Sequence, residues 1–171
     1  MDKRLAGIYL IMREFGGFNI DDLEKRVILQ KTIYLTQILG LDLRFRFNWY
    51  IHGPYSPDLT TCAFELNEDN EAKDQFKELP IRIDVRKRIE ILKDWLKARP
   101  TDLKIPKWLE LISSIHYVKN IHYTPNDVTR ENIKDRLRES GKDDFTSEQI
   151  SSAWSVLESA DLIRDRKLSP P

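Results

Sequence analysis

Apolar residues recur every three or four positions along most of the chain, with polar residues between them. This spacing places the apolar side chains on one face of a helix. Leu5, Ile8 and Met12 follow it in the first segment, and Gly16-Gly17 marks the end of that helix. The pattern predicts helices over residues 3–15, 22–39, 57–66, 85–99 and 106–120, and two more that begin near Thr124 and Thr146.

The spacing changes between residues 44 and 51, where arginine and phenylalanine alternate before an aromatic run. Alternation of this kind predicts a β-strand, with the phenylalanines at 45 and 47 buried and the arginines at 44 and 46 exposed. A turn follows at Gly53-Pro54, because glycine and proline both favour tight turns. We expect the strand and the turn to belong to a small β-hairpin.

Capping residues mark two of the predicted helix starts. Ser56 followed by Pro57 is typical of a helix N-terminus. Thr146 with Gln149 three residues later matches a capping box. Residues 67–79 are acidic, and we expect a loop or a frayed helix there.

These elements predict a mainly α fold, a helical domain with a small β-hairpin that brings it to the margin of the α+β class. We divide the chain into a helix–hairpin–helix region, 1–80, and a helical remainder, 81–171, which is either part of the same domain or a small C-terminal subdomain. The last predicted helix runs into residues 161–163, a short strand or a staple. This end resembles the close of a winged-helix module, in which a helix leads into a β-wing.

Two motifs stand out from this helical background. The first is Leu29-Gln30-Lys31, followed at suitable spacing by Tyr34-Leu35, and the second is Tyr50-Ile51-His52-Gly53-Pro54-Tyr55-Ser56. Together they resemble the motifs of the Panacea domain, the SocA-like antitoxin family, and of related small proteins of the YwgA type, over residues 5–66. The resemblance implies a non-enzymatic protein-interaction module, such as an antitoxin, an adaptor to proteolysis or a phage-defence accessory protein. His52 departs from the family pattern, which often has tyrosine there.

A polar and aromatic set of residues surrounds the Gly-Pro turn: Gln30, Lys31, Tyr34, His52 and Tyr55. One interpretation is structural, in which the helical members brace the turn through hydrogen bonds to its backbone. The other is functional, in which the set lines a surface that captures a protein partner. The sequence leaves both open.

Composition limits the remaining function classes. The chain is 40% hydrophobic and 33% charged, with a formal net charge of zero, so no global charge favours nucleic acid or a membrane. A single cysteine, Cys62, permits no internal disulfide and fits a reducing compartment. We find no signal-peptide pattern and no apolar run long enough to span a membrane. The sequence thus predicts a cytoplasmic protein.

One local exception to the charge balance is the stretch from Arg82 to Lys107, which has nine basic and four acidic residues, with Trp95 inside it and Trp108 directly after it. Such a stretch can contact a phosphate backbone, and a DNA-binding winged-helix regulator is therefore the alternative function. Its candidate contacts are Arg86, Lys87, Lys93 and Lys97. The competing interpretation is a solvated helix face that pairs with the acidic residues between Glu65 and Glu78.

Catalytic and metal chemistry have little support in the sequence. An enzyme that uses His52 is a further alternative, but no nucleophile, base and acid occur together in a recognisable motif. His116 and His122 lack further ligands at metal spacing, so we predict no metal site and no cofactor. The predicted partners are a protein, namely a toxin, a protease or a defence effector, with DNA and a second copy of the chain as alternatives and no membrane.

Overall fold

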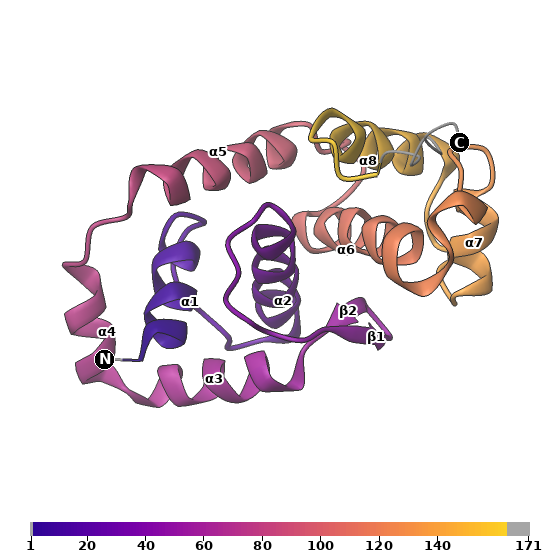
Figure 1. Cartoon of the computed structure of the whole chain (residues 1–171). Helices are drawn as coiled ribbons and strands as arrows, with labels where there is room; N and C mark the ends of the chain where they lie inside the picture. Colours follow the sequence, from indigo (N-terminus) through magenta and orange to yellow (C-terminus); the bar gives the residue numbers. More distant parts are fainter. Residues whose placement is uncertain (1, 164–171) are drawn as a thin grey trace, which may run out of the picture. The chain divides into compact units, whose positions relative to one another are not determined.

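Helices dominate the computed structural model, which describes residues 2–163 (Figure 1). The only strands within these residues form one antiparallel hairpin, in which Trp49 pairs with Pro54. The structure thereby confirms the predicted mainly α fold with a small hairpin. The chain divides into two compact units between Lys97 and Ala98.

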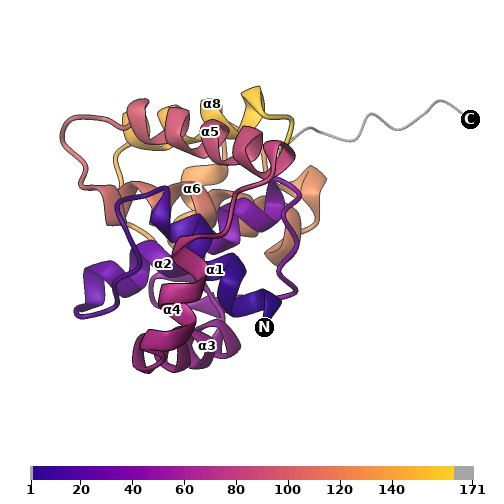
Figure 2. The same ribbon diagram turned by 90° about the vertical axis from the view of Figure 1, so that its left-hand side faces the viewer.

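The first unit contains five helices and the hairpin. Helices α1 and α2 contact each other, α1 also contacts α3 and α4, and α2 contacts α5. Figures 1 and 2 show α1 and α2 lying between α3 and α5. The bounds are α1 Lys3–Arg13, α2 Leu23–Ile38, β1 Asn48–Tyr50, β2 Gly53–Tyr55, α3 Pro57–Glu68, α4 Asn70–Lys77 and α5 Ile83–Lys97.

A side-chain cap and a glycine set the two ends of helix α2. Asp22 caps its N-terminus, where the carboxylate accepts a hydrogen bond from the Lys25 N–H at 2.8 Å. Gly40 follows its C-terminus with a φ of +94°, a conformation that glycine adopts without strain. Ser56 caps α3 in the same way and accepts from the Leu59 N–H at 3.2 Å, as its sequence predicted.

The predicted strand over residues 44–51 is shorter than expected, because β1 begins only at Asn48. The Asp42 carboxylate accepts a hydrogen bond from the Arg44 N–H at 2.7 Å, and Arg44 has a φ of +62°. This turn keeps residues 44–47 out of the hairpin. The alternation in burial persists nonetheless, since Phe45 is buried and both arginines are exposed.

Residues 67–79 contain a regular helix, α4, where the sequence predicted a loop or a frayed end. Asp69 caps it by accepting from the Ala72 N–H at 2.8 Å. The ring of Phe76 is buried and lies 6.0 Å from the ring of Tyr9 on α1. One buried aromatic therefore anchors an otherwise polar helix.

The division between units also lies later than the boundary predicted at residue 80. Helix α5 belongs to the first unit because Ile89 joins that unit's core and Lys93 pairs at 3.4 Å with Glu14, the residue after the end of α1. The acidic residues 65–78 and the basic helix α5 therefore belong to one unit, whereas residues 98–107 of the basic stretch belong to the second.

The second unit is built around α6, which contacts α7 and α8. A π-helical turn at Val118–His122 extends α6, and Thr146 forms the predicted capping box with Gln149 at the start of α8. Leu162 and its neighbours form a turn, and within residues 2–163 no strand follows α8. The short strand predicted at 161–163 is therefore not formed, and a β-wing after it would lie outside the described residues. The bounds are α6 Ile105–Tyr117, α7 Ile133–Glu139 and α8 Ser147–Ser159, with a 3-10 turn at Pro125–Asp127.

Three charged side chains are buried inside the second unit, Glu110, Lys119 and Lys142. The Lys142 ammonium lies 2.6 Å from the Glu110 carboxylate, and both side chains are almost fully buried. Lys119 donates to the carbonyls of Pro125 and Val128 at 2.6 and 2.8 Å. Buried charges of this kind tolerate the interior only when paired or hydrogen-bonded.

Candidate functional site

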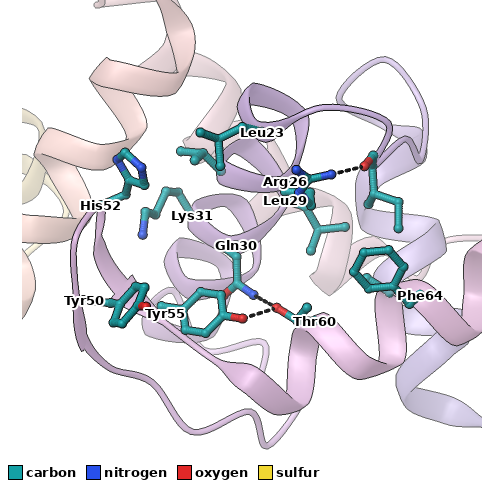
Figure 3. Close-up of a pocket in the computed structure, with 13 residues that line it drawn as sticks. Leu23, Arg26, Leu29, Gln30, Lys31, Tyr50, His52, Tyr55, Thr60 and Phe64 are labelled. Atoms are coloured by element: carbon teal, nitrogen blue, oxygen red, sulfur yellow. Dashed lines mark hydrogen bonds between the residues drawn. The ribbon is translucent and has the colours of Figure 1, made fainter.

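A cavity of about 260 Å³ opens between α2, the hairpin and α3 (Figure 3). We call it the groove. Both Panacea-like motifs contribute to it, since one lies on α2 and the other forms the hairpin and the start of α3. Its lining is mostly apolar and consists of Ile20, Leu23, Arg26, Val27, Leu29, Gln30, Lys31, Tyr50, His52, Tyr55, Thr60, Ala63 and Phe64.

Two glutamines of α2, one helical heptad apart, hold the main chain on either side of the hairpin. The amide of Gln30 accepts from the Ser56 N–H at 2.9 Å and donates to the Ser56 carbonyl and the Thr60 hydroxyl, each at 2.9 Å. Gln37 repeats the arrangement, because it accepts from the Phe45 N–H and donates to the Phe45 carbonyl, both at 3.0 Å. Each side-chain amide thus makes the two main-chain hydrogen bonds that a neighbouring strand would make with one residue, Ser56 or Phe45.

Lys31 holds the second strand of the hairpin. The turn itself lies at Ile51 and His52, whereas the sequence predicted it at Gly53-Pro54, which are paired in β2. Its side chain is only 1% exposed, and its ammonium donates to the Pro54 carbonyl at 2.5 Å. Tyr34, one turn further along α2, is buried against Phe47, with ring centroids 5.1 Å apart and planes at 75°. Gln30, Lys31 and Tyr34 therefore have the bracing role of the structural interpretation, and Tyr34 does not line the groove.

Tyr55 and His52 are the two predicted residues that reach the groove surface, and both are half-buried. The Tyr55 hydroxyl accepts from the Thr60 hydroxyl at 2.9 Å. Its ring lies 5.4 Å from that of Tyr50, so the two rings support each other. Figure 3 shows His52 and Tyr55 on the hairpin side, with Phe64 at the opposite end.

The rim of the groove contains three large apolar side chains that sequence reasoning did not select. Leu23 is 56% exposed, Tyr50 60% and Phe64 48%. We call these the rim residues. Phe64 was detectable in principle, because it stands beside the apolar stripe of α3 but not within it. Leu23 was not, since its helical spacing assigned it to the core.

The positively charged candidates lie on α5, away from the groove lining. Lys93 pairs with Glu14 at 3.4 Å and Glu90 at 3.1 Å, and Lys97 pairs with Asp94 at 2.8 Å. Arg86 and Lys87 are exposed on the same helix. These ion pairs run within α5 and to α1, whereas the sequence suggested partners between residues 65 and 78.

The tryptophans in and directly after the basic stretch, Trp95 and Trp108, are both buried, so neither ring is exposed to stack on a base. The ion pairs of Lys93 and Lys97 also lower the net charge that α5 offers to a phosphate backbone. No geometry in the first unit therefore favours the nucleic-acid alternative over the groove.

Burial is the main cause of the pKa shifts of Cys62 and His116. Burial raises the pKa of the Cys62 thiol, which suits a packed side chain more than a nucleophile. Burial lowers the pKa of His116 to about 4, so this imidazole is neutral at pH 7. The groove lining includes no aspartate or glutamate. Within residues 2–163 no three His, Cys, Asp or Glu side chains are placed to hold a metal ion.

A search of the helices within residues 2–163 finds none with the length and apolar character needed to cross a bilayer. Neither the family models, nor the curated proteins, nor the solved structures compared with this chain match it. The resemblance to the Panacea domain therefore stays a prediction that depends on the two motifs around Lys31 and Gly53.

Proposed function

We propose that this chain is a non-enzymatic protein-interaction module that docks a protein partner in the groove. The observation that carries the proposal is the cluster of Leu23, Tyr50 and Phe64 around one apolar cavity. Single exposed apolar side chains are common on proteins, but a cluster around a concave apolar site is typical of a binding surface.

The supporting structure of the groove favours binding over catalysis. Gln30 and Lys31 fix the backbone that carries Tyr55 and His52, so the surface is formed before a partner arrives. Preformed sites bind more tightly because less conformational entropy is lost on binding. Burying the exposed parts of the three rim residues would contribute about 2–4 kcal/mol before the cost of association.

The class of partner follows from the resemblance to the Panacea domain. In that family the partner is a toxin, a protease or a phage-defence effector, and the chain would act as its antitoxin, adaptor or accessory protein. A second copy of the chain is the alternative occupant, and the experiment below separates the two.

Site-specific photo-crosslinking tests the proposal. A photoreactive phenylalanine analogue replaces Phe64, and the protein is irradiated in the cells that naturally produce it. The matched control places the analogue at Ile83, which is 75% exposed on α5 and outside the groove. We expect one discrete protein adduct from position 64 that position 83 does not give.

The adduct is then identified by mass spectrometry, purified and titrated against the wild-type chain, Phe64→Ser and Ile83→Ser. Loss of affinity in Phe64→Ser alone supports the proposal. Identical adducts from both positions, or equal affinity of both variants, would show that the groove is not the docking site. An adduct with the chain itself would identify the partner as a second copy.

A further inference from the structure

Arg26 is a cation on the wall of an apolar groove. It projects from α2 between Leu23 and Leu29, half-buried (Figure 3). One guanidinium nitrogen donates to the Ile20 carbonyl at 3.1 Å. A guanidinium carries five N–H donors, and within residues 2–163 no carboxylate forms an ion pair with Arg26. Arg26 therefore has no ion-pair partner in the described part of the chain. The Lys25 N–H and, to a smaller degree, the charge of Arg26 lower the pKa of Asp22, so this carboxylate attracts the guanidinium only at longer range.

The acidic residues next to it in sequence are engaged elsewhere. Asp22 caps α2 and also pairs with the Lys25 ammonium at 3.2 Å. Asp21 pairs with the same ammonium at 3.8 Å. The groove lining includes the guanidinium of Arg26 and no aspartate or glutamate. Arg26 thus adds a positive charge to a mostly apolar wall.

The size of the cavity limits what enters it. A volume of about 260 Å³ exceeds the ~150 Å³ in which an apolar cavity binds benzene. It therefore admits one large side chain with room for its neighbours, and not a second folded element. Val27, Leu29 and Ala63, all buried, form apolar parts of its wall.

We infer that the occupant of the groove is a peptide segment of a partner protein that carries a large apolar side chain next to an acidic one. The apolar side chain fills the cavity, and the carboxylate pairs with the guanidinium of Arg26. This inference rests on the proposed function of the groove. It follows from charge complementarity, because an arginine fork binds a carboxylate through two parallel hydrogen bonds and repels a basic segment.

Three blocked tetrapeptides test this inference as defined probes. Each is acetylated and amidated, has glycine at both ends and differs only in its centre: Phe-Glu, Phe-Gln or Phe-Lys. Binding to the full chain is followed by NMR through the methyl groups of Leu23, Val27 and Ala63. We expect the glutamate peptide to bind roughly three- to tenfold more tightly than the glutamine peptide, with the lysine peptide weakest.

Arg26→Gln should reduce the preference for glutamate over glutamine to less than twofold, and Arg26→Lys should restore part of it. Arg46→Gln is the matched control, because Arg46 is exposed and does not line the groove. It should leave the preference unchanged. Raising the salt concentration should weaken only the glutamate peptide appreciably.

The outcomes separate this inference from the proposed function. Equal binding of all three peptides at the groove methyls overturns the acidic occupant and leaves docking in place. A glutamate preference that survives in Arg26→Gln also overturns it. If none of the peptides shifts the groove methyls at millimolar concentration, both the inference and the proposed function fail.

Discussion

Replacement of Gln30 by methionine tests whether α2 holds the start of α3 in place. Methionine has a similar length and flexibility, but its thioether is only a weak acceptor and cannot donate. In the variant the buried Ser56 N–H loses the acceptor that now lies 2.9 Å away. The Ser56 carbonyl is less affected, because it also accepts from the Thr60 N–H at 3.2 Å.

The expected cost can be worked from these contacts. A buried N–H without an acceptor costs about 1–3 kcal/mol, and each of the two other lost hydrogen bonds contributes about 1 kcal/mol or less. We therefore expect Gln30→Met to lower the free energy of unfolding by about 2–4 kcal/mol. That is a large part of the 5–15 kcal/mol typical of a folded domain.

Gln37→Met is the matched control. It removes the same pair of main-chain hydrogen bonds, at Phe45, but Gln37 is half-buried and water can replace its amide. We expect a loss of about 1 kcal/mol or less. Urea titration gives both free energies, and amide hydrogen exchange at Ser56 and Leu59 locates the effect. Equal losses in the two variants, or a loss below about 1 kcal/mol in Gln30→Met, would refute the reasoning.

Two further predictions concern buried titratable groups of the second unit. Burial lowers the pKa of His116 to about 4. As the pH falls below about 6.5, the unfolded chain therefore binds a proton at this imidazole, whereas the folded chain binds it only near pH 4. Stability should therefore fall by about 2 kcal/mol between pH 7 and pH 4.5, and His116→Gln should remove this part of the slope in urea titrations at the two pH values. Lys142→Met takes away the ammonium 2.6 Å from Glu110, whereas Lys107 stays 3.5 Å from the same carboxylate, so the cost should fall below the about 3–5 kcal/mol of a buried charge left alone. Changing both Lys142 and Glu110 to methionine should restore most of the loss. A double variant as unstable as the single one would show that the packing of Lys142, and not the charge left on Glu110, sets the cost.

Local rules were enough to predict most helices from the sequence. Ser56, Thr146 and Gly40 marked helix ends correctly, because caps depend on neighbouring residues alone. Helix α4 was missed since its stability comes from one long-range contact, the burial of Phe76 beside Tyr9. The sequence pattern within residues 67–79 does not predict a contact with a residue so far away in the chain.

The candidate site was predicted in part. The residues around the turn do come together, but Lys31 is buried and Tyr34 faces Phe47, so their role is to support the hairpin. The surface itself is formed by the rim residues. Their exposure depends on how α2, the hairpin and α3 meet, which periodicity within a single helix does not encode.

The contacts of α2 with the hairpin fix the path of its main chain and do not depend on the side chains that a partner would meet. Gln30, Gln37 and Lys31 bind main-chain atoms of the connection, and main-chain atoms are the same whatever side chain a residue carries. A two-stranded hairpin this short is not stable alone, so these contacts determine its path. The outward side chains at Asn48 and Tyr50 are then free to change without altering that path. One helix can in this way support many different binding surfaces, and a lineage could acquire a new partner by exchanging a few exposed residues on an unchanged frame.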